Sequence, residues 1–218
     1  MIGFADTKQI DKNEWVFSEN YPIEDKNFSE HIATVEFGYN FWKYNLNILT
    51  SDEVKAGIKL SAKLDRIPHG IIDKRITGIG ATTLEINSPR NSIIILPTRV
   101  LAYNKVISNP DVKCLYVGGE FLEQTKTVSK EDILRYYNNP TIRFKKFMVV
   151  ADSLSKLISA IGEEVFNNYF FMIDEIDMVQ ADSNYRPNLE NALDFYFEFP
   201  KKSRCLLTAT LNEFSHPK

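Results

Sequence analysis

The stretch YFFMIDEID at positions 169–177 constrains the fold most, because an apolar run breaks abruptly into acidic residues. The apolar part is typical of a short strand buried on both faces of a parallel sheet. The carboxylates of Asp174, Glu175 and Asp177 would repel one another in a dry site unless a cation lay among them. Because α/β sheets bind ligands at the carboxyl ends of their strands, we expect Mg²⁺ carried by a nucleotide here. For this stretch alone, the alternative is a strand followed by a solvated turn.

From Gly70 onward, short apolar runs alternate with amphipathic segments. This alternation predicts βαβ units and an α/β fold with a mostly parallel sheet covered by helices on both faces. The expected strands span 71–73, 92–96, 113–117, 146–150, 170–173 and 205–207. The expected helices span 81–86, 100–107, 130–137, 154–167 and 189–197.

Residues 1–68 differ from the rest, and we expect them to form an N-terminal extension packed on a domain at 69–218. The aromatic and β-branched content of 31–49 predicts extended structure. Ser51 and the acidic residues after it predict the start of a helix that ends at Pro68. The same stretch also alternates apolar and polar residues with period two, as a strand does. No residue of the extension indicates a chemical role.

The 218 residues, 44% of them hydrophobic, are enough for one α/β domain with a buried core. The formal net charge of −3 excludes a global basic field, so any contact with nucleic acid must use local clusters. The candidate clusters are Lys145-Lys146 and Lys201-Lys202 with Arg204. Such small basic groups are more often solvated faces than binding sites.

Cys114 and Cys205 each lie in an apolar, strand-like run, which predicts buried free thiols in a reducing compartment. The two cysteines and three histidines do not have the spacing of a zinc site. No apolar run reaches the length of a membrane helix, and the N-terminus lacks the pattern of a signal peptide. We therefore expect a cytoplasmic protein that does not bind membranes.

The stretch TGIGATT at 77–83 follows an expected strand and opens an expected helix. Glycines let the backbone fold around an oxyanion, and the amides at a helix N-terminus point at it, as in a phosphate-binding loop. Thr82 occupies the position of the hydroxyl that binds Mg²⁺, but Ala81 stands where a lysine normally precedes it. A glycine turn without a ligand is the alternative.

We expect Lys74 or Arg75, just upstream, to supply the missing positive charge. In this respect the loop looks similar to that of some phage DNA-packaging terminase motors, which carry the basic residue at the start of the loop. The candidate nucleotide-binding residues are Lys74, Arg75, Thr77, Gly78, Ile79, Gly80, Ala81, Thr82 and Thr83.

Polar residues follow several other expected strands. Thr98 and Arg99, after Pro97, offer a hydroxyl and a guanidinium suited to a nucleic-acid phosphate. Gly119 ends the next expected strand, and Asp152 and Ser153 end another, with Ser153 a candidate helix cap.

The stretch Thr208-Ala209-Thr210 follows the last expected strand. Its two hydroxyl groups are suited to hydrogen bonding with the acidic cluster and to reporting the occupancy of that cluster to another surface.

Taken in order, these stretches resemble the first RecA-like lobe of superfamily 2 helicases of the DEAD/DEAH type, a P-loop NTPase, over about 70–210. In that resemblance TGIGATT is the Walker A loop, PTR is motif Ia, and VADS lies near motif Ib. DEID is then the Walker B motif and TAT is motif III. The resemblance implies ATP and Mg²⁺ as cofactors and a single strand of DNA or RNA as partner.

The resemblance also implies residue roles. Thr82 and Asp174 would hold Mg²⁺, and Glu175 would polarise the attacking water. Asp177 would contact Thr208 and Thr210. The residues along the nucleic-acid backbone would be Arg99, Gly119, Asp152 and Ser153.

Two departures from the family pattern bear on catalysis. Ala81 replaces the family's lysine, and the sequence ends eight residues after Thr210, before the second lobe that brings arginine fingers. Losing an arginine finger costs roughly a thousandfold or more in rate. We therefore expect little hydrolysis without a second RecA-like lobe from the parent chain or another subunit.

The favoured interpretation is the ATP-binding motor lobe of a nucleic-acid helicase or translocase. One alternative is a terminase-like packaging ATPase with a displaced basic residue. The other is a catalytically degenerate module that binds a nucleotide or nucleic acid.

Overall fold

The computed structural model describes residues 4–11, 14–21, 33–37, 42–46, 49, 51–74, 78–120, 126–176 and 188–209. For the strands before residue 47, only the backbone is described. No helix among these residues has the length and apolar character needed to cross a membrane.

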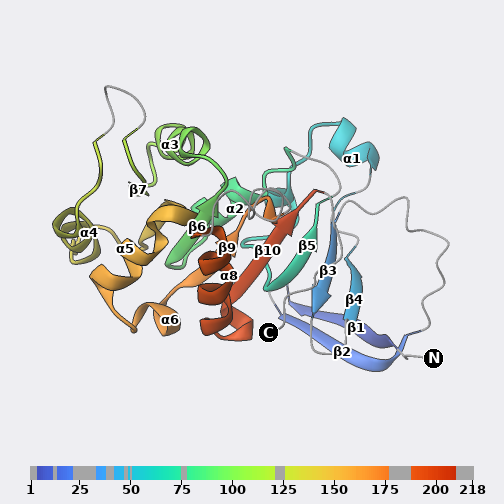
Figure 1. Ribbon diagram of the computed structural model, residues 1–218. Coiled ribbons are helices and arrows are strands. Elements are labelled where there is room, and N and C mark those ends of the chain that lie inside the picture. The colour runs from blue at the N-terminus through green and yellow to red at the C-terminus, as the bar shows by residue number, and fades with distance from the viewer. Residues whose placement is uncertain are drawn as a thin grey trace.

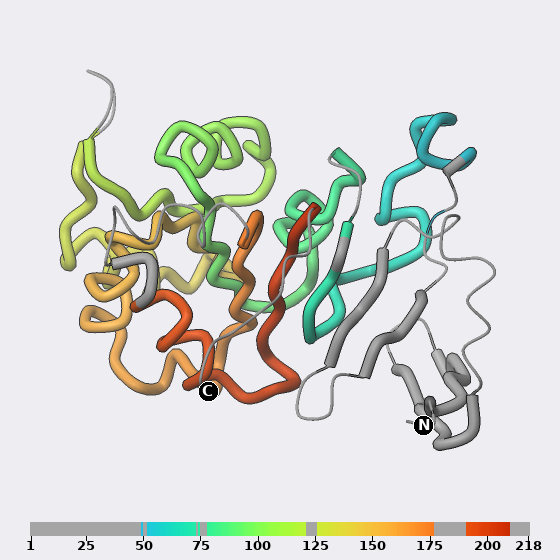
Figure 2. Tube along the Cα trace, turned by 45° about the vertical axis from the view of Figure 1, so that its right-hand side comes forward, coloured from blue at the N-terminus to red at the C-terminus, as the bar shows by residue number. Residues whose placement is uncertain are grey.

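Six described strands lie parallel in one sheet, as the alternating pattern predicts. In spatial order they are β5 (Gly70–Asp73), β10 (Arg204–Thr208), β9 (Phe170–Ile173), β6 (Ser92–Leu96), β8 (Lys146–Val150) and β7 (Cys114–Val117). In Figure 2 the red β10 runs between the teal β5 and the orange β9. The carboxyl ends of all six strands therefore meet at one edge of the sheet.

Two antiparallel strands extend the sheet beyond β5. They are β3 (Ala33–Phe37), which pairs with β5, and β4 (Trp42–Leu46), which pairs with β3. They confirm the extended structure expected within 31–49. Another antiparallel pair, β1 (Phe4–Asp11) and β2 (Glu14–Tyr21), forms a two-stranded sheet of its own.

Helices cover both faces of the sheet (Figure 1). Their bounds are α2 (Ala81–Asn87), α3 (Arg99–Ile107), α4 (Lys130–Tyr137), α5 (Ala151–Ile161), α6 (Val165–Asn168) and α8 (Asn188–Glu198). Because strand side chains alternate, Ile94 of β6 packs in the same core cluster as Leu84 of α2, while Ile93 packs with Leu157 of α5 on the other face. Each fully buried side chain of this size contributes about 1.5–3 kcal/mol.

The helix expected from Ser51 to Pro68 is wrong in its extent. The structure has only α1 (Ser51–Lys55), then a 3₁₀ turn, η2 (Leu60–Ala62). Gly57, at φ +81°, takes a left-handed conformation that a helix does not tolerate. Beyond it, Leu60 at the start of η2 and Leu64 just after η2 pack in the core.

Two details of α5 also differ from expectation. The helix begins at Ala151, so Ser153 is a buried residue of its first turn and not the cap. The single helix expected over 154–167 is divided, because Gly162, at φ +96°, ends α5 before α6 begins.

The two cysteines are free thiols, as expected. Cys205 is fully buried in β10, and burial raises the pKa of the half-buried Cys114 to about 11. Burial also raises the pKa of Cys205, so both thiols stay protonated near neutral pH.

Candidate functional site

The candidate site lies at the carboxyl ends of the parallel strands, where the chain after β5 and the chain after β9 lead to helices on opposite faces of the sheet. After β5 the chain leads into α2, whose Leu84 packs on one face of the sheet. In the sequence α8 follows β9 and precedes β10, and its Ala192 packs on the opposite face of the sheet. Ligands of open α/β sheets bind in crevices of this kind.

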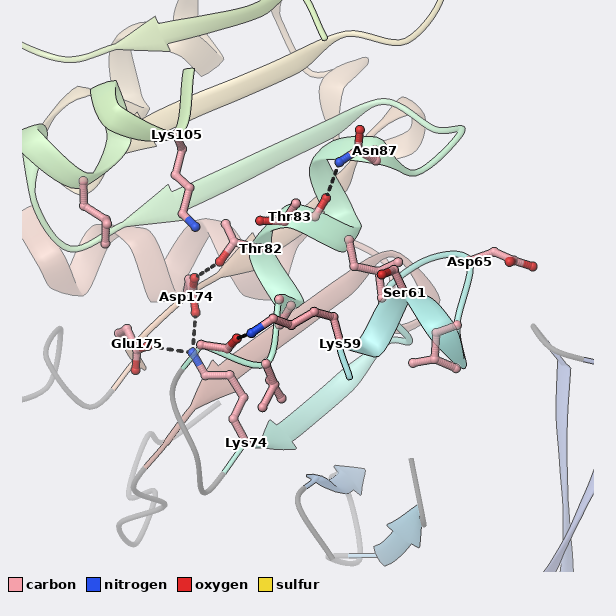
Figure 3. Close-up of a pocket in the computed structure, with 17 residues that line it drawn as sticks. Lys59, Ser61, Asp65, Lys74, Thr82, Thr83, Asn87, Lys105, Asp174 and Glu175 are labelled. Atoms are coloured by element: carbon pink, nitrogen blue, oxygen red, sulfur yellow. Dashed lines mark hydrogen bonds and ion pairs between the residues drawn. The ribbon is translucent and has the colours of Figure 1, made fainter. Parts of the chain in front are cut away.

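Lys74 lies at the carboxyl end of β5 and reaches across to the acidic residues after β9 (Figure 3). Its Nζ donates hydrogen bonds to Oδ1 of Asp174 at 2.8 Å and to Oε1 of Glu175 at 2.7 Å. Its backbone N–H donates to the carbonyl of Thr208 at 2.6 Å, which fixes the lysine backbone against β10. Of the two upstream candidates, Lys74 thus contacts the carboxylates, and Arg75 lies outside the described residues.

Lys74 is charged despite being only 4% exposed. Burial alone would lower its pKa, but attraction to Asp174 and hydrogen bonds to Asp174 and Glu175 outweigh it, so the pKa lies above the ordinary value. The site therefore contains a buried cation between two carboxylates.

The glycine turn meets the acidic cluster through Thr82. The Thr82 hydroxyl donates to Oδ2 of Asp174 at 2.5 Å, so the two carboxylate oxygens of Asp174 accept from Thr82 and Lys74 respectively. The Asp174 backbone N–H donates to the carbonyl of Ile95 at 3.0 Å, which holds the aspartate at the sheet edge. The expected meeting of glycine turn and carboxylates is thus a feature of the structure.

The turn itself has the backbone that its glycines allow. Gly78 and Gly80 have φ values of +77° and +87°, in the left-handed region. Ile79 between them is buried and accepts a hydrogen bond from Leu60 N–H at 3.0 Å, while Lys59 Nζ donates to the Gly78 carbonyl at 2.8 Å. The segment that includes η2 therefore supports the turn through these two hydrogen bonds.

Glu175 is the one described non-glycine residue with a positive φ, at 57°. Non-glycine residues adopt this conformation rarely, and it is found often at functional sites. The conformation follows directly after β9 and accompanies the contact of the Glu175 carboxylate with Lys74.

These residues line one pocket with a volume of about 660 Å³. Its walls include the candidate residues Lys74, Gly78, Ile79, Gly80, Ala81, Thr82, Thr83, Asp174 and Glu175. Sequence reasoning missed the other lining residues, which are Lys59, Ser61, Leu64, Asp65, Leu84, Asn87, Leu101 and Lys105. The first four come from a segment whose period-two pattern resembles a strand, and no motif marked them.

Thr82 and Asp174 are the described residues that could hold a metal ion such as Mg²⁺. Thr82 and Asp174 place a hydroxyl and a carboxylate side by side, both hard oxygen ligands. The described residues contain no cluster of three or more His, Cys, Asp or Glu side chains suited to a metal. Mg²⁺ commonly binds through one or two protein oxygens and completes its shell with phosphate and water.

The residues expected along a nucleic-acid backbone lie at the same sheet edge. Thr98 caps α3 by accepting from Leu101 N–H at 3.2 Å, directly after Pro97. The exposed Arg99 donates to the Glu120 carbonyl at 3.2 Å, and its guanidinium would lie 3.2 Å from a Cβ added at Gly119. Arg99, after β6, therefore contacts the segment after β7, although β8 lies between the two strands.

Asp152 and Ser153 follow β8 but differ in exposure. Asp152 is exposed on the first turn of α5, whereas Ser153 is buried. Ser153 therefore has little surface for contact with a nucleic-acid strand.

The stretch Thr208-Ala209-Thr210, which was expected to contact the acidic cluster, is described only in part. Thr208 is buried and Ala209 is half-buried, both next to the site through β10. Thr77, Asp177 and Thr210, like Arg75, lie outside the described residues.

The basic pair Lys145-Lys146 is not a surface cluster, which corrects one expectation. Lys146 is buried and donates to the Glu85 carbonyl at 2.7 Å and to the hydroxyls of Ser88 and Ser92 at 2.9 and 3.0 Å. Lys145 is also buried and donates to backbone carbonyls.

The second candidate basic cluster, Lys201-Lys202 with Arg204, does not act as one group. Arg204 donates to the carbonyls of Tyr196, Phe197 and Phe199 near the end of α8. Lys201 and Lys202 remain exposed.

No protein-family model matches the chain, and a search of curated proteins finds no significant match.

Proposed function

We propose that the pocket binds ATP with Mg²⁺ and that the chain provides the ATP-binding motor lobe of a nucleic-acid helicase or translocase. The observation that carries this proposal is the meeting of Thr82, beside the glycine turn, with Asp174 and Lys74 in one pocket. A hydroxyl, a carboxylate and an ammonium are the groups that a metal-bound triphosphate requires.

Lys74 supplies the positive charge that Ala81 cannot. Its ammonium lies at the carboxylates in the absence of ligand, and a phosphate chain offers it stronger acceptors in the same pocket. Ala81, Thr82 and Thr83 line the pocket, and their backbone N–H groups lie in the first turn of α2, where the helix offers them no acceptor.

Asp174 and Glu175 have different roles in this proposal. Asp174 and Thr82 would hold Mg²⁺, which when bound would neutralise charge on the phosphates. Glu175, held beside Asp174 by its positive φ, orients and polarises the attacking water once Lys74 has moved to the phosphates.

Contact with a nucleic acid falls to the exposed residues at the neighbouring strand ends. Arg99 is the clearest candidate, because its exposed guanidinium lies at the end of β6 beside Gly119. We propose that hydrolysis requires a second RecA-like lobe, from the same protein or another subunit, that stabilises charge on the transferred phosphoryl group from the other side.

Lys74 also favours a second candidate, a terminase-like packaging ATPase. Its position at the start of the loop, in place of a lysine at 81, is the specific observation behind this alternative. A degenerate module that binds nucleotide without turnover is the third candidate.

ATP hydrolysis with and without nucleic acid separates these candidates. We expect Mg²⁺-dependent ATP binding by the chain, and turnover stimulated by single-stranded DNA or RNA when a second lobe is present. Stimulation by double-stranded DNA alone would favour a packaging motor. Binding that Asp174→Ala abolishes, without turnover under any condition, would favour the degenerate module, and the absence of nucleotide binding would refute all nucleotide-based candidates.

A further inference from the structure

Lys105 approaches the pocket from α3, which contains none of the residues proposed to hold the nucleotide or its metal. It is half-buried and lines the pocket together with Leu101, one helical turn earlier. In Figure 3 its side chain extends from α3 toward Thr82 and Asp174.

Among the described residues, Lys105 differs from the other two lysines of the pocket because its ammonium has no partner. Lys59 donates to the Gly78 carbonyl, and Lys74 forms ion pairs with Asp174 and Glu175. Within the described part of the chain, the Lys105 ammonium makes no hydrogen bond or ion pair. Since a partly desolvated ammonium gains most from a charged acceptor, this group is available for an anion in the pocket.

We propose that Lys105 binds the terminal phosphate of the nucleotide and thereby makes the pocket prefer a triphosphate to a diphosphate. The inference rests on the proposed function, because it assigns a role within the same nucleotide site. In the proposed function, Thr82 and Asp174 would hold the metal, which would place the outer phosphates of a triphosphate near these two residues. The Lys105 side chain extends from α3 toward Thr82, and in this proposal its ammonium would contact the terminal phosphate.

The charges of the pocket support the same assignment. Lys74 is shared between two carboxylates, so in the free protein its charge is already compensated. Lys105 adds an uncompensated positive charge, and the terminal phosphate is the group by which a triphosphate exceeds a diphosphate in negative charge. Its contact should therefore strengthen triphosphate binding more than diphosphate binding.

Calorimetric titration of the full chain tests the proposal. The ligands are a non-hydrolysable ATP analogue and ADP, each with Mg²⁺, and the variants are Lys105→Ala and Lys105→Arg. We expect Lys105→Ala to weaken binding of the triphosphate about tenfold, as for the loss of one charge-assisted hydrogen bond, and binding of ADP less than about twofold. Lys105→Arg, which keeps the charge, should retain most of the preference.

Lys130→Ala is the matched control, because Lys130 is an exposed lysine of α4 outside the pocket. It should leave both affinities unchanged. Thermal unfolding of each variant verifies that the fold is retained.

The outcomes distinguish the two proposals. If the wild type binds the triphosphate but Lys105→Ala binds both nucleotides as the wild type does, or weakens both equally, the role of Lys105 is refuted and the nucleotide site stands. If the wild type binds neither nucleotide, the proposed function itself fails, and the role of Lys105 fails with it.

Discussion

The ammonium of Lys74 lies 2.8 Å from Oδ1 of Asp174, although the two residues are 100 positions apart in the sequence. They directly follow β5 and β9, strands that do not pair because β10 lies between them. The lysine side chain therefore spans the end of β10 and joins the two halves of the site.

We predict that Lys74→Ala destabilises the nucleotide-free protein by about 3–5 kcal/mol, because it leaves two carboxylates close together in a buried site without their cation. Urea denaturation measures the change, and Mg²⁺ should recover part of the loss by replacing the ammonium. Lys130→Ala is the control, with no expected effect. An unchanged free energy of unfolding in Lys74→Ala would show that the ion pairs do not stabilise the fold.

Thr82→Val removes the hydroxyl that contacts Asp174 while keeping the side-chain volume. We expect binding of an ATP analogue to lose about tenfold in affinity with Mg²⁺ present and much less with EDTA, because the hydroxyl acts through the metal. Thr83→Val, at the exposed neighbouring position, is the matched comparison and should have a smaller effect. Equal losses in both buffers would argue against a metal ligand at Thr82.

Gly80→Ala should reduce both stability and nucleotide affinity. At φ +87° an alanine is strained by about 1–2 kcal/mol, and its Cβ would lie 3.4 Å from Cβ of Lys59, the residue that supports the turn. Gly162→Ala also introduces strain at a positive φ, but with no atom within 4 Å of the new Cβ and outside the pocket. Gly162→Ala should lower the melting temperature without changing nucleotide affinity. If both variants lost affinity, the effect of Gly80→Ala would come from general destabilisation of the fold and not from the turn at the pocket.

Stability should depend on pH through Lys146. Burial lowers the pKa of Lys146 to about 8, below the value of about 10.4 in an unfolded chain. The folded protein therefore releases this proton first, and its stability rises as the pH increases from about 8 to about 10.4. The wild type should gain stability over this range relative to Lys146→Met, measured by urea denaturation at both ends. Parallel pH profiles would show that Lys146 titrates normally.

The strands and most helices follow from local pattern. β6, β8 and β9 match their expected bounds, because an unbroken apolar run buried on both faces has few alternatives. α4 begins at its expected residue because Ser129 and Asp132 form a capping box.

The sequence was less informative where the contacts are long-range. The segment around Lys59 lines the pocket because Leu60 pairs with the glycine turn, a contact that no local pattern encodes. Lys146 looked like part of a basic surface, but Glu85 and the serines around it make burial possible. Lys105 lies in an ordinary amphipathic helix, and only the packing of α3 beside the pocket reveals it.

The central claim is that one triphosphate and its metal bind between the glycine turn and the carboxylates after β9. Equilibrium binding of a fluorescent, non-hydrolysable ATP analogue to the wild type and to Asp174→Asn, with Mg²⁺ or with EDTA, tests it most directly. We predict saturable binding to the wild type that weakens at least about tenfold with EDTA or in Asp174→Asn. Binding that neither EDTA nor Asp174→Asn alters, or no binding to the wild type, would contradict the claim.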